Sequence, residues 1–481
     1  MRFTTLLTFL LFSAAQVFSQ DNLGIVHSNY SPVNTVLSNP ASIVDSKAFI
    51  DFQLVGFSVF AKNNLAYLPK DEFRFADTWQ NPDAVPEPVF GIPSNNSRAH
   101  ANVSLRGPSV SFAVGKNSFA LTTQFRSVTD LRRVPDHLVR YMQNGLQWEP
   151  QMGDEFSARN VSLASLNWAE IGLSYGRIVH QRGNDMITAG ISLKYLLGFA
   201  GGGVRIDRWD YTVADSSNLE TSQFVGEFGF NEPGEGDALF NGRGFGADLG
   251  VVYKKTTKNV ESYTPHSPRE GCRTSDYEYK LGVSILDLGL IRFNEPFYGY
   301  SFDISDPRTW EDYPNFNPDG ADEISNGLAE EFALNDGGGE ISALRVKLPT
   351  AISLQYDHRV LNNVYLGGHW IQGFPRRNSL GPQRPAQVAF IPRFETKRFE
   401  ASLPLILHEY SSAQMGLMLR LNSIVIGTDN LGAFLFNQDV YGADFYFSLK
   451  YTIFRHWKCA KKSRSRGRGR GGRSIPPCPS W

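Results

Sequence analysis

One stretch of the sequence carries the spacing of a serine nucleophile. Gly172-Leu173-Ser174-Tyr175-Gly176 matches the G-x-S-x-G pattern, in which a hydrolase holds its serine on a sharp turn between a strand and a helix. Here the match lies inside a segment of alternating apolar and polar residues, which is typical of a strand. The glycines and Ser174 would then share one face of that strand, without the turn that exposes a nucleophile. No reactive constellation in the sequence passes this contextual test, so we do not expect an enzyme.

A second stretch has the spacing with which a calcium loop begins. Asn315, Asn317 and Asp319 alternate with other residues and are followed by Gly320. The twelfth position is Asn326, however, where calcium loops carry a bidentate glutamate. The nine histidines are scattered without the spacing of metal ligands. We therefore expect a solvated acidic loop here, and no metal or cofactor.

The first 19 residues have the organisation of a secretory signal peptide. Arg2 precedes an apolar run from Leu6 to Phe12, and small residues lead to Ser19, after which cleavage is expected. Beyond residue 20 no apolar run approaches the roughly 18 residues of a transmembrane helix. An exported chain without membrane-spanning helices is therefore predicted.

Three cysteines are present, at Cys272, Cys459 and Cys478. Because exported chains can form disulfides, Cys459 and Cys478, which are close in the sequence, are candidates for a pair. The alternative is three free or crosslinking thiols.

Residues 455–481 form a basic tail with nine Lys or Arg and no acidic residue. Its composition predicts disorder. Similar Arg- and Gly-rich segments bind RNA, but export argues against a nucleic-acid partner. The alternatives are contact with anionic envelope polymers or an acidic protein, and a solvated extension without a partner.

The elements that must position any site are strands. From Gly442 to Phe454 apolar residues occupy every odd position from Ala443 to Ile453, while Asp444, Ser448, Lys450 and Thr452 occupy even ones. Thirteen residues, tilted by about 45°, span roughly 30 Å, the thickness of a bilayer's hydrocarbon core. Comparable patterns predict 14 strands in all, with a range of 12–16. They lie at 48–61, 110–114, 119–125, 169–179, 187–197, 244–254, 277–285, 342–358, 364–374, 386–396, 398–409, 411–421, 423–430 and 442–454.

The predicted fold is an all-β transmembrane antiparallel barrel at 48–454, in which the first and last strands pair. An even strand number returns the chain to its starting side, so short turns fall on one side and long extracellular loops on the other. The long segments are 62–100, 129–159 with a short helix at 136–146, 198–242 with an extended hairpin allowed inside it, 294–341 and 375–385. The segment 255–275 is an exception, because it is long and lies on the side of the short turns.

A soluble β-sandwich is the alternative, since its strands also alternate. Many of the predicted strands exceed the usual five or six residues, and the face opposite the apolar stripe is small or polar, as suits a hydrated lumen. These features favour the membrane barrel. The charged residues expected to face its lumen are Glu170, Lys194, Asp248, Asp444 and Lys450.

The segment from 20 to 47 precedes the barrel and is rich in turn formers. Two prolines, Pro32 and Pro40, argue against a strand. We expect this segment either to fold into the lumen as a plug or to stay on the periplasmic side, and the motif Asn39-Pro40-Ala41 marks it.

Several short motifs carry a family resemblance. Asn39-Pro40-Ala41, the strand Glu170 to Tyr175, Gly246 to Gly250 and Gly442 to Phe447 resemble a Bacteroidota outer-membrane barrel family of uncharacterised function. More distantly, the chain is similar to FadL-like transporters and to the barrel accessories of type IX secretion and gliding. The resemblance implies a 14-stranded barrel and, from the transporters, an N-terminal plug. The basic tail departs from the family pattern of ending at a strand-final aromatic residue.

These observations lead to two functional hypotheses. The first is a non-enzymatic outer-membrane barrel that serves as a scaffold or accessory for surface-protein export or attachment, surrounded by lipid and lipopolysaccharide and contacting a periplasmic or secreted protein. The alternative is a FadL-like pore for hydrophobic or small solutes, motivated by the plug at 21–45 and the Gly-rich lumen face.

Overall fold

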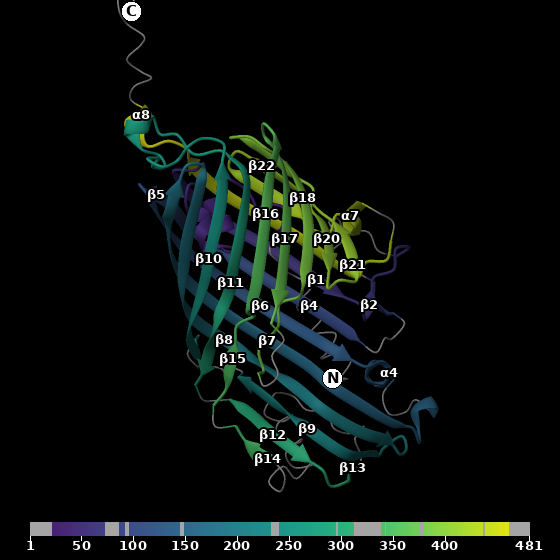
Figure 1. Cartoon of the computed structure of the whole chain (residues 1–481). Coiled ribbons are helices and arrows are strands. Elements are labelled where there is room, and N and C mark those ends of the chain that lie inside the picture. The colour runs from purple at the N-terminus through teal and green to yellow at the C-terminus, as the bar shows by residue number, and fades with distance from the viewer. Residues whose placement is uncertain are drawn as a thin grey trace, which may run out of the picture.

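The computed structural model describes residues 22–72, 86–91, 96–144, 149–231, 240–294, 297–311, 338–341, 343–374, 379–435 and 438–460 (Figure 1). The predicted signal peptide, the calcium-like segment from Asn315 to Asn326, Cys478 and the tail beyond residue 460 lie outside these ranges.

The chain forms a closed antiparallel barrel of 14 strand positions. The barrel closes where β1 pairs with β24, with Phe57 opposite Phe447. Some positions are filled by two short strands in line. In order around the wall the strands are β1 (Ile50–Asn63), β4 (Ser97–Arg106) with β5 (Ser109–Val114), β6 (Asn117–Val134), β7 (Glu155–Arg182), β8 (Asp185–Val213), β10 (Gly242–Thr256), β11 (Tyr277–Phe293), β15 (Arg345–Lys347) with β16 (Ala351–Leu361), β17 (Val364–Gly373), β18 (Gln387–Glu395), β19 (Phe399–Ser402) with β20 (Leu405–His408), β21 (Ser412–Met415) with β22 (Leu417–Leu421), β23 (Ile424–Thr428) and β24 (Gly442–Ile453).

Side chains on the two faces of the wall differ as the alternation predicts. Large apolar side chains such as Leu173, Leu193 and Phe245 are exposed on the outside, while polar side chains such as Glu170 and Lys194 are buried inside. A closed wall leaves no sheet edge, and its apolar exterior suits lipid. The predicted all-β transmembrane barrel of 14 strands is thus confirmed. Within the described ranges, no helix is both long and apolar enough to cross a membrane.

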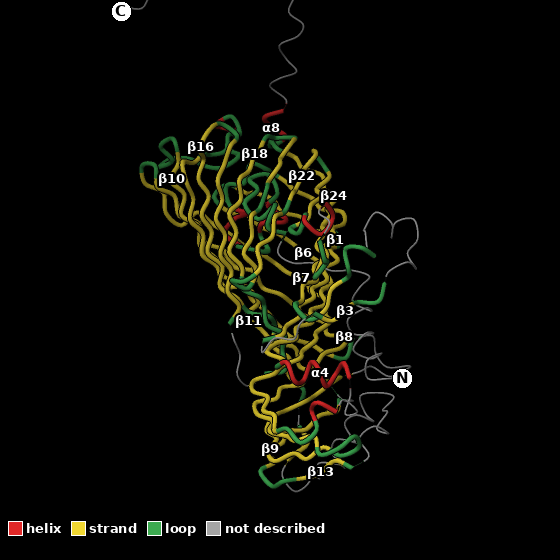
Figure 2. Tube along the Cα trace, turned by 90° about the vertical axis from the view of Figure 1, so that its right-hand side faces the viewer, coloured by secondary structure: helices red, strands yellow, loops and turns green. Residues whose placement is uncertain are grey.

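The two ends of the barrel are unlike. One end, called the turn end below, holds the short connections at 115–116, 183–184 and 362–363. The α8 helix (Trp457–Ala460) lies at this end, while α4 (Asp136–Asn144), β9 (Leu219–Asn231) and β13 (Arg308–Trp310) lie at the opposite end, called the loop end (Figure 2). A helix at 136–146 is the one helix predicted from the sequence, and α4 fills most of that range.

A sheet extends the wall beyond the barrel at the loop end. β7 and β8 are 28 and 29 residues long, whereas about 9–11 residues cross a membrane. The far part of β8 pairs with β9, which in turn pairs with β12 (Tyr298–Ile304) and β13, and β14 (Gly338–Glu340) pairs with β12 (Figure 1). Phe228, Phe302 and Ile304 form the buried core of this extension. The extended hairpin allowed inside the segment at 198–242 is thus present, formed by the far part of β8 and by β9. The segment at 294–341, predicted as a long loop, contains the strands β12, β13 and β14.

The N-terminal segment lies inside the barrel. Residues 22–47, called the plug below, form two short turns of helix, α2 (Pro32–Thr35) and η2 (Pro40–Ile43), and almost all of their side chains are buried. Pro32 and Pro40 each occupy the first helical turn, where a missing N–H costs no hydrogen bond.

The disulfide between Cys459 and Cys478 predicted from the sequence is wrong. Cys459 in α8 pairs instead with Cys272, which lies 187 residues earlier in the connection between β10 and β11. The pairing forms where the connection between β10 and β11 reaches α8 at the turn end. The ring of Phe49, just before β1, packs against both segments, with centroid distances of 5.5 Å to His266 and 5.8 Å to Trp457.

Cys478 is therefore expected to be the thiol that alkylates without reduction in the purified, oxidised protein. Mass spectrometry of a non-reducing digest checks this, since it should recover Cys272 and Cys459 in one linked peptide pair. A linked peptide containing Cys459 and Cys478 would contradict the observed pairing.

Candidate functional site

The plug is seated against wall strands that carry glycine at the points of contact. A Cβ atom built on Gly190 of β8 would lie 2.5 Å from the carbonyl carbon of Pro40, and one on Gly250 of β10 would lie 2.1 Å from Asn39 Oδ1. One on Gly176 of β7 would lie 2.6 Å from Val44 Cγ2. Such distances are too short for any side chain, so glycine on three neighbouring strands makes room for the plug.

Asn39, the first residue of the plug motif, explains why the motif lies at this contact. Its side-chain oxygen accepts a hydrogen bond from Ala41 N–H at 3.0 Å and caps η2. Its amide nitrogen points at the wall, 3.4 Å from the carbonyl oxygens of both Val251 and Val283. The motif Asn39-Pro40-Ala41 thus both shapes the plug and binds it to β10 and β11.

The connection between β10 and β11, residues 257–276, covers the plug at the turn end and is called the strap. Asp45 of the plug accepts hydrogen bonds from Lys254 Nζ at 2.8 Å and Tyr263 OH at 2.5 Å. His266 Nε2 donates a hydrogen bond to Ser46 O at 2.9 Å, because a carbonyl oxygen can only accept, and burial lowers the pKa of His266. The disulfide joins this same strap to α8, so plug, strap and C-terminal helix form one connected unit.

A cluster of buried charges lies in the lumen beyond the plug. Lys194 Nζ is 2.8 Å from carboxylate oxygens of both Asp248 and Asp287, and Arg126 binds both oxygens of Asp287 at 2.9 and 3.1 Å. A β-bulge between β10 and β11, with Asp287 at a φ of 54°, places these two carboxylates side by side. Glu170 completes the cluster at 3.7 Å from Arg126.

A second buried cluster holds the plug against the opposite wall. Arg393 is 3.0 Å from Asp357 and 3.2 Å from Glu395, and all three side chains are fully buried. Glu395 in turn accepts hydrogen bonds from the backbone and side-chain N–H groups of Asn29 in the plug, at 3.0 and 2.9 Å.

The closing strand also touches the plug. Lys450 Nζ donates to Ser31 Oγ at 2.6 Å and lies 3.2 Å from Asp51. Asp444 accepts a hydrogen bond from the backbone of Asp429.

The structure places all five predicted lumen residues inside the barrel, with exposed fractions between 1% and 6%. It joins Glu170, Lys194 and Asp248 in one cluster and keeps Asp444 and Lys450 apart from it. The hydrated lumen expected from the sequence is filled at the turn end by the plug, so these charges meet protein partners there.

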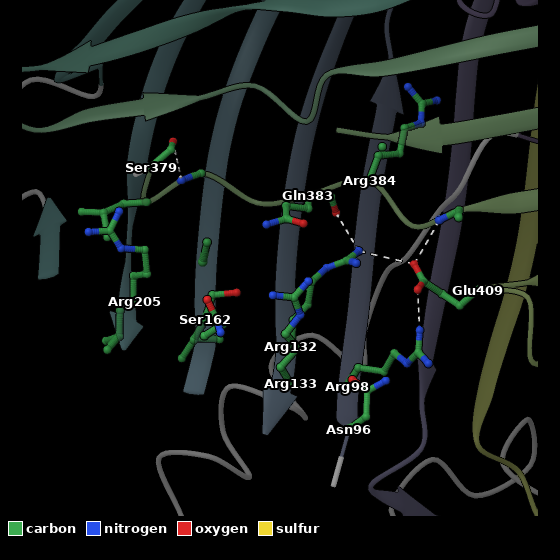
Figure 3. Close-up of a pocket in the computed structure, with 18 of the residues that line it drawn as sticks. Asn96, Arg98, Arg132, Arg133, Ser162, Arg205, Ser379, Gln383, Arg384 and Glu409 are labelled. Atoms are coloured by element: carbon green, nitrogen blue, oxygen red, sulfur yellow. Dashed lines mark hydrogen bonds and ion pairs between the residues drawn. The ribbon is translucent and has the colours of Figure 1, made fainter. Parts of the chain in front are cut away.

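At the loop end the lumen widens into a cavity of about 600 Å³, called the rim cavity (Figure 3). Five arginines line it, together with two carboxylates and several amides and hydroxyls. The charged lining residues are Arg98, Arg132, Arg133, Arg205, Arg384, Asp207 and Glu409. They come from the ends of β4, β6 and β8 and from the connections after β17 and β20.

A smaller cavity of about 50 Å³ continues from the rim cavity toward the plug. Arg384 lines both cavities. On the plug side the inner cavity is lined by residues such as Asn22 and Ser38, and on the wall side by Arg106, Arg126, Lys194 and Asp287. The rim cavity, the inner cavity and the plug therefore follow one another along the lumen.

Sequence reasoning missed the rim arginines. Arg98 and Arg132 lie within segments predicted as long loops, and Glu409 was assigned to the end of a strand. A single strand period cannot identify them, because they come from different strands and connections and meet only when the barrel is closed.

The G-x-S-x-G pattern does not form a turn between a strand and a helix. Ser174 lies mid-strand in β7, where its hydroxyl is 2.7 Å from that of Ser192 in β8. Across the described parts of the chain, no group of three His, Cys, Asp or Glu side chains is placed to hold a metal ion.

Comparisons with known proteins give distant likenesses. The chain is similar to a FadL homologue of Pseudomonas aeruginosa, with 12% identity over 91% of this chain and 98% of that one, at a TM-score of 0.41. It is also similar to the toluene transporter TbuX of Ralstonia pickettii, with 8% identity over 88% of this chain and 94% of that one, at a TM-score of 0.39. For the toluene transporter TodX of P. putida the identity is 9% over 88% of this chain and 95% of that one, at a TM-score of 0.38.

No curated protein matches the chain. A family of unknown function, DUF5723, matches residues 40–429, from the plug motif to the end of β23. Because this match covers most of the sequence, the chain belongs to the DUF5723 family.

Proposed function

We propose that the protein is an outer-membrane channel for small solutes that its own N-terminal segment holds closed. The observation that carries this proposal is the order of features along the lumen. A cavity of about 600 Å³ opens at the loop end, a smaller cavity follows, and the plug fills the turn end. In this proposal the turn end, with the plug and α8, faces the periplasm, and the loop end faces the outside.

The kind of contact between plug and wall supports a removable seal. Asp45, Asn29 and Ser31 bind the wall or the strap through hydrogen bonds and charged groups. Polar contacts of this kind exchange with water, at a net cost of about 1.5–3 kcal/mol for each hydrogen bond to a charged group. Apolar contacts hold the plug as well, since Leu23 and Val26 pack with Ala389, Ile391 and Ile406 of the wall, and Ile25 packs with Met418 and Val425. The plug leaves the lumen only when these apolar contacts are broken together with the polar ones.

Removing residues 22–47 is expected to convert a silent barrel into a conducting one. Purified full-length protein and the deletion variant are reconstituted in planar bilayers, and single-channel conductance is recorded. A variant lacking residues 461–481 keeps the plug and should stay closed. Folding of each variant is checked by heat-modifiable migration in detergent gels. A barrel that stays sealed without its plug would refute the channel.

A scaffold for surface-exposed or secreted proteins is the second candidate, and one observation favours it. β7, β8 and β9, with β12, carry a sheet well beyond the length that a membrane requires. Such a sheet offers a platform outside the bilayer. A barrel that is sealed both with and without residues 22–47 would favour this candidate, because a scaffold needs no open lumen.

A further inference from the structure

Positive groups outnumber negative groups among the side chains that line the rim cavity. Five arginines face two carboxylates there, and in the inner cavity Arg106, Arg126, Lys194 and Arg384 face Asp287 alone. Several of these arginines pair with carboxylates, such as Arg384 with Asp287 at 3.5 Å and Arg205 with Asp207 at 3.3 Å. The lining that a solute would touch therefore carries more positive than negative groups.

Glu409 shows how an anion fits this surface. It lies in the tight turn between β20 and β21, with a φ of 49°. Its carboxylate forms an ion pair with Arg98, lies 3.5 Å from Arg132, and accepts a hydrogen bond from the backbone N–H of Ala386 at 3.0 Å (Figure 3). Two guanidinium groups and one N–H group thus converge on a single carboxylate, as they would on a bound ligand.

Arg133 adds a cation beside this arrangement. It lines the rim cavity next to Arg132. Among the side chains that the structure describes, none forms an ion pair or hydrogen bond with its guanidinium. Its φ of 57° is unusual for a residue with a side chain, and it lies where the pairing of β6 with β4 shifts register by a β-bulge. A second negative group on a ligand would find a partner here.

We propose that the rim cavity binds small, water-soluble anions that carry two or more phosphate or carboxylate groups, and that such an anion displaces Glu409 from Arg98 and Arg132. Guanidinium groups bind both kinds of anion through paired N–H donors. Gln372, Gln383 and Ser162 add further hydrogen-bonding groups to the lining. A volume of about 600 Å³ suits a ligand of small-molecule size.

The inner cavity offers the bound anion further cationic side chains on the way from the rim cavity to the plug. Arg384 lines both cavities, and Arg126 and Lys194 follow it toward the plug. Pores that select anions are lined by arginine and lysine in this way. The proposed binding site names the class of solute for the proposed channel. Only the movement of the anion from the rim cavity into the inner cavity rests on the channel proposal.

Binding is tested on the full-length protein in detergent micelles by isothermal titration calorimetry at low ionic strength. The probes are inorganic pyrophosphate, citrate and, as a neutral control, sucrose. Both anions should bind more tightly than sucrose, and the comparison of pyrophosphate with citrate shows which anionic group the site prefers. Equal, weak binding of all three probes would overturn the proposal.

Two variants test the displacement of Glu409. Replacing both Arg98 and Arg132 with glutamine should weaken binding at least about tenfold, because charge-assisted hydrogen bonds are lost. Glu409→Gln should instead strengthen binding about tenfold, since the competing carboxylate is gone while its shape remains. Arg159→Gln is the matched control, because Arg159 pairs with Asp210 on an exposed part of β7 outside the rim cavity and should leave affinity unchanged.

The outcomes separate this site from the channel. An unchanged affinity in the folded Glu409→Gln variant would overturn the site, whether or not the barrel conducts. Binding that follows these expectations in a barrel that stays sealed without its plug would uphold the site and refute the channel.

Discussion

Gly190→Val is expected to open the barrel while leaving its wall intact. The new side chain would meet the backbone of Pro40 and Ala41, which lie 2.5 and 2.6 Å from the position of its first carbon. Backbone cannot move aside as a flexible side chain can, so η2 would have to leave its seat. Valine itself favours a strand and should not disturb β8.

Single-channel recording should therefore show conductance for Gly190→Val close to that of the protein without residues 22–47. Gly368→Val in β17 is the matched control, because the nearest atom to a Cβ there is 3.8 Å away, on the side chain of Tyr356. This variant should remain closed. A silent Gly190→Val barrel that keeps its plug protected from protease would contradict the observed seat.

Arg393→Met is expected to lower the free energy of unfolding by about 3–5 kcal/mol. Arg393 is fully buried and balances Asp357, Glu395 and, at 3.8 Å, Glu400. Removing Arg393 takes the cation away from Glu395 in a site that water does not reach, while Asp357 keeps Lys280 at 3.3 Å and Glu400 keeps Arg420 at 2.8 Å. This is costlier than replacing the whole cluster with apolar residues, because burying an unpaired charge is the main penalty.

Urea unfolding of the protein in lipid vesicles, followed by tryptophan fluorescence, measures this loss. Arg359→Met is the control, because Arg359 is partly exposed and pairs with Asp276 at a longer distance of 3.8 Å. Its effect should stay below about 1 kcal/mol. Equal effects of the two substitutions would show that the buried cluster does not stabilise the fold.

The barrel itself could be predicted because its strongest constraint acts on every second residue. In β24 the apolar stripe from Ala443 to Ile453 faces outward and Asp444 and Lys450 face inward, as the alternation requires. Lipid outside and a polar lumen inside impose the same rule on each strand, so strands were found one at a time. β9 and β12 lie in the sheet beyond the barrel. Aromatic and charged residues do not alternate there between an apolar and a polar face, so the alternation does not predict these strands.

The remaining features depend on closure of the wall. Cys272 and Cys459 are remote in the sequence and meet only in the folded barrel, where the strap reaches α8. Arg98 of β4, Arg132 of β6 and Glu409 of the turn after β20 are brought to one cavity by the closed wall. The need for glycine at position 190 is explained only by its close contact with Pro40 in the folded barrel. Local periodicity contains no information about such pairs, and this is why the site was not predicted.

Contacts between the plug and the last strands bear on how the molecule assembles. Leu23 N–H donates to Asp429, 406 residues later, and Lys450 donates to Ser31, 419 residues earlier. Closing loops of this length is entropically costly, and contacts between distant residues form late in folding. The first segment to be synthesised thus waits for the last one before it is held. A barrel in which β24 has not yet paired with β1 would have an open wall and would lack contacts that hold the plug, so it would be leaky. Pairing of these two strands therefore closes the wall and fixes the plug at the same time.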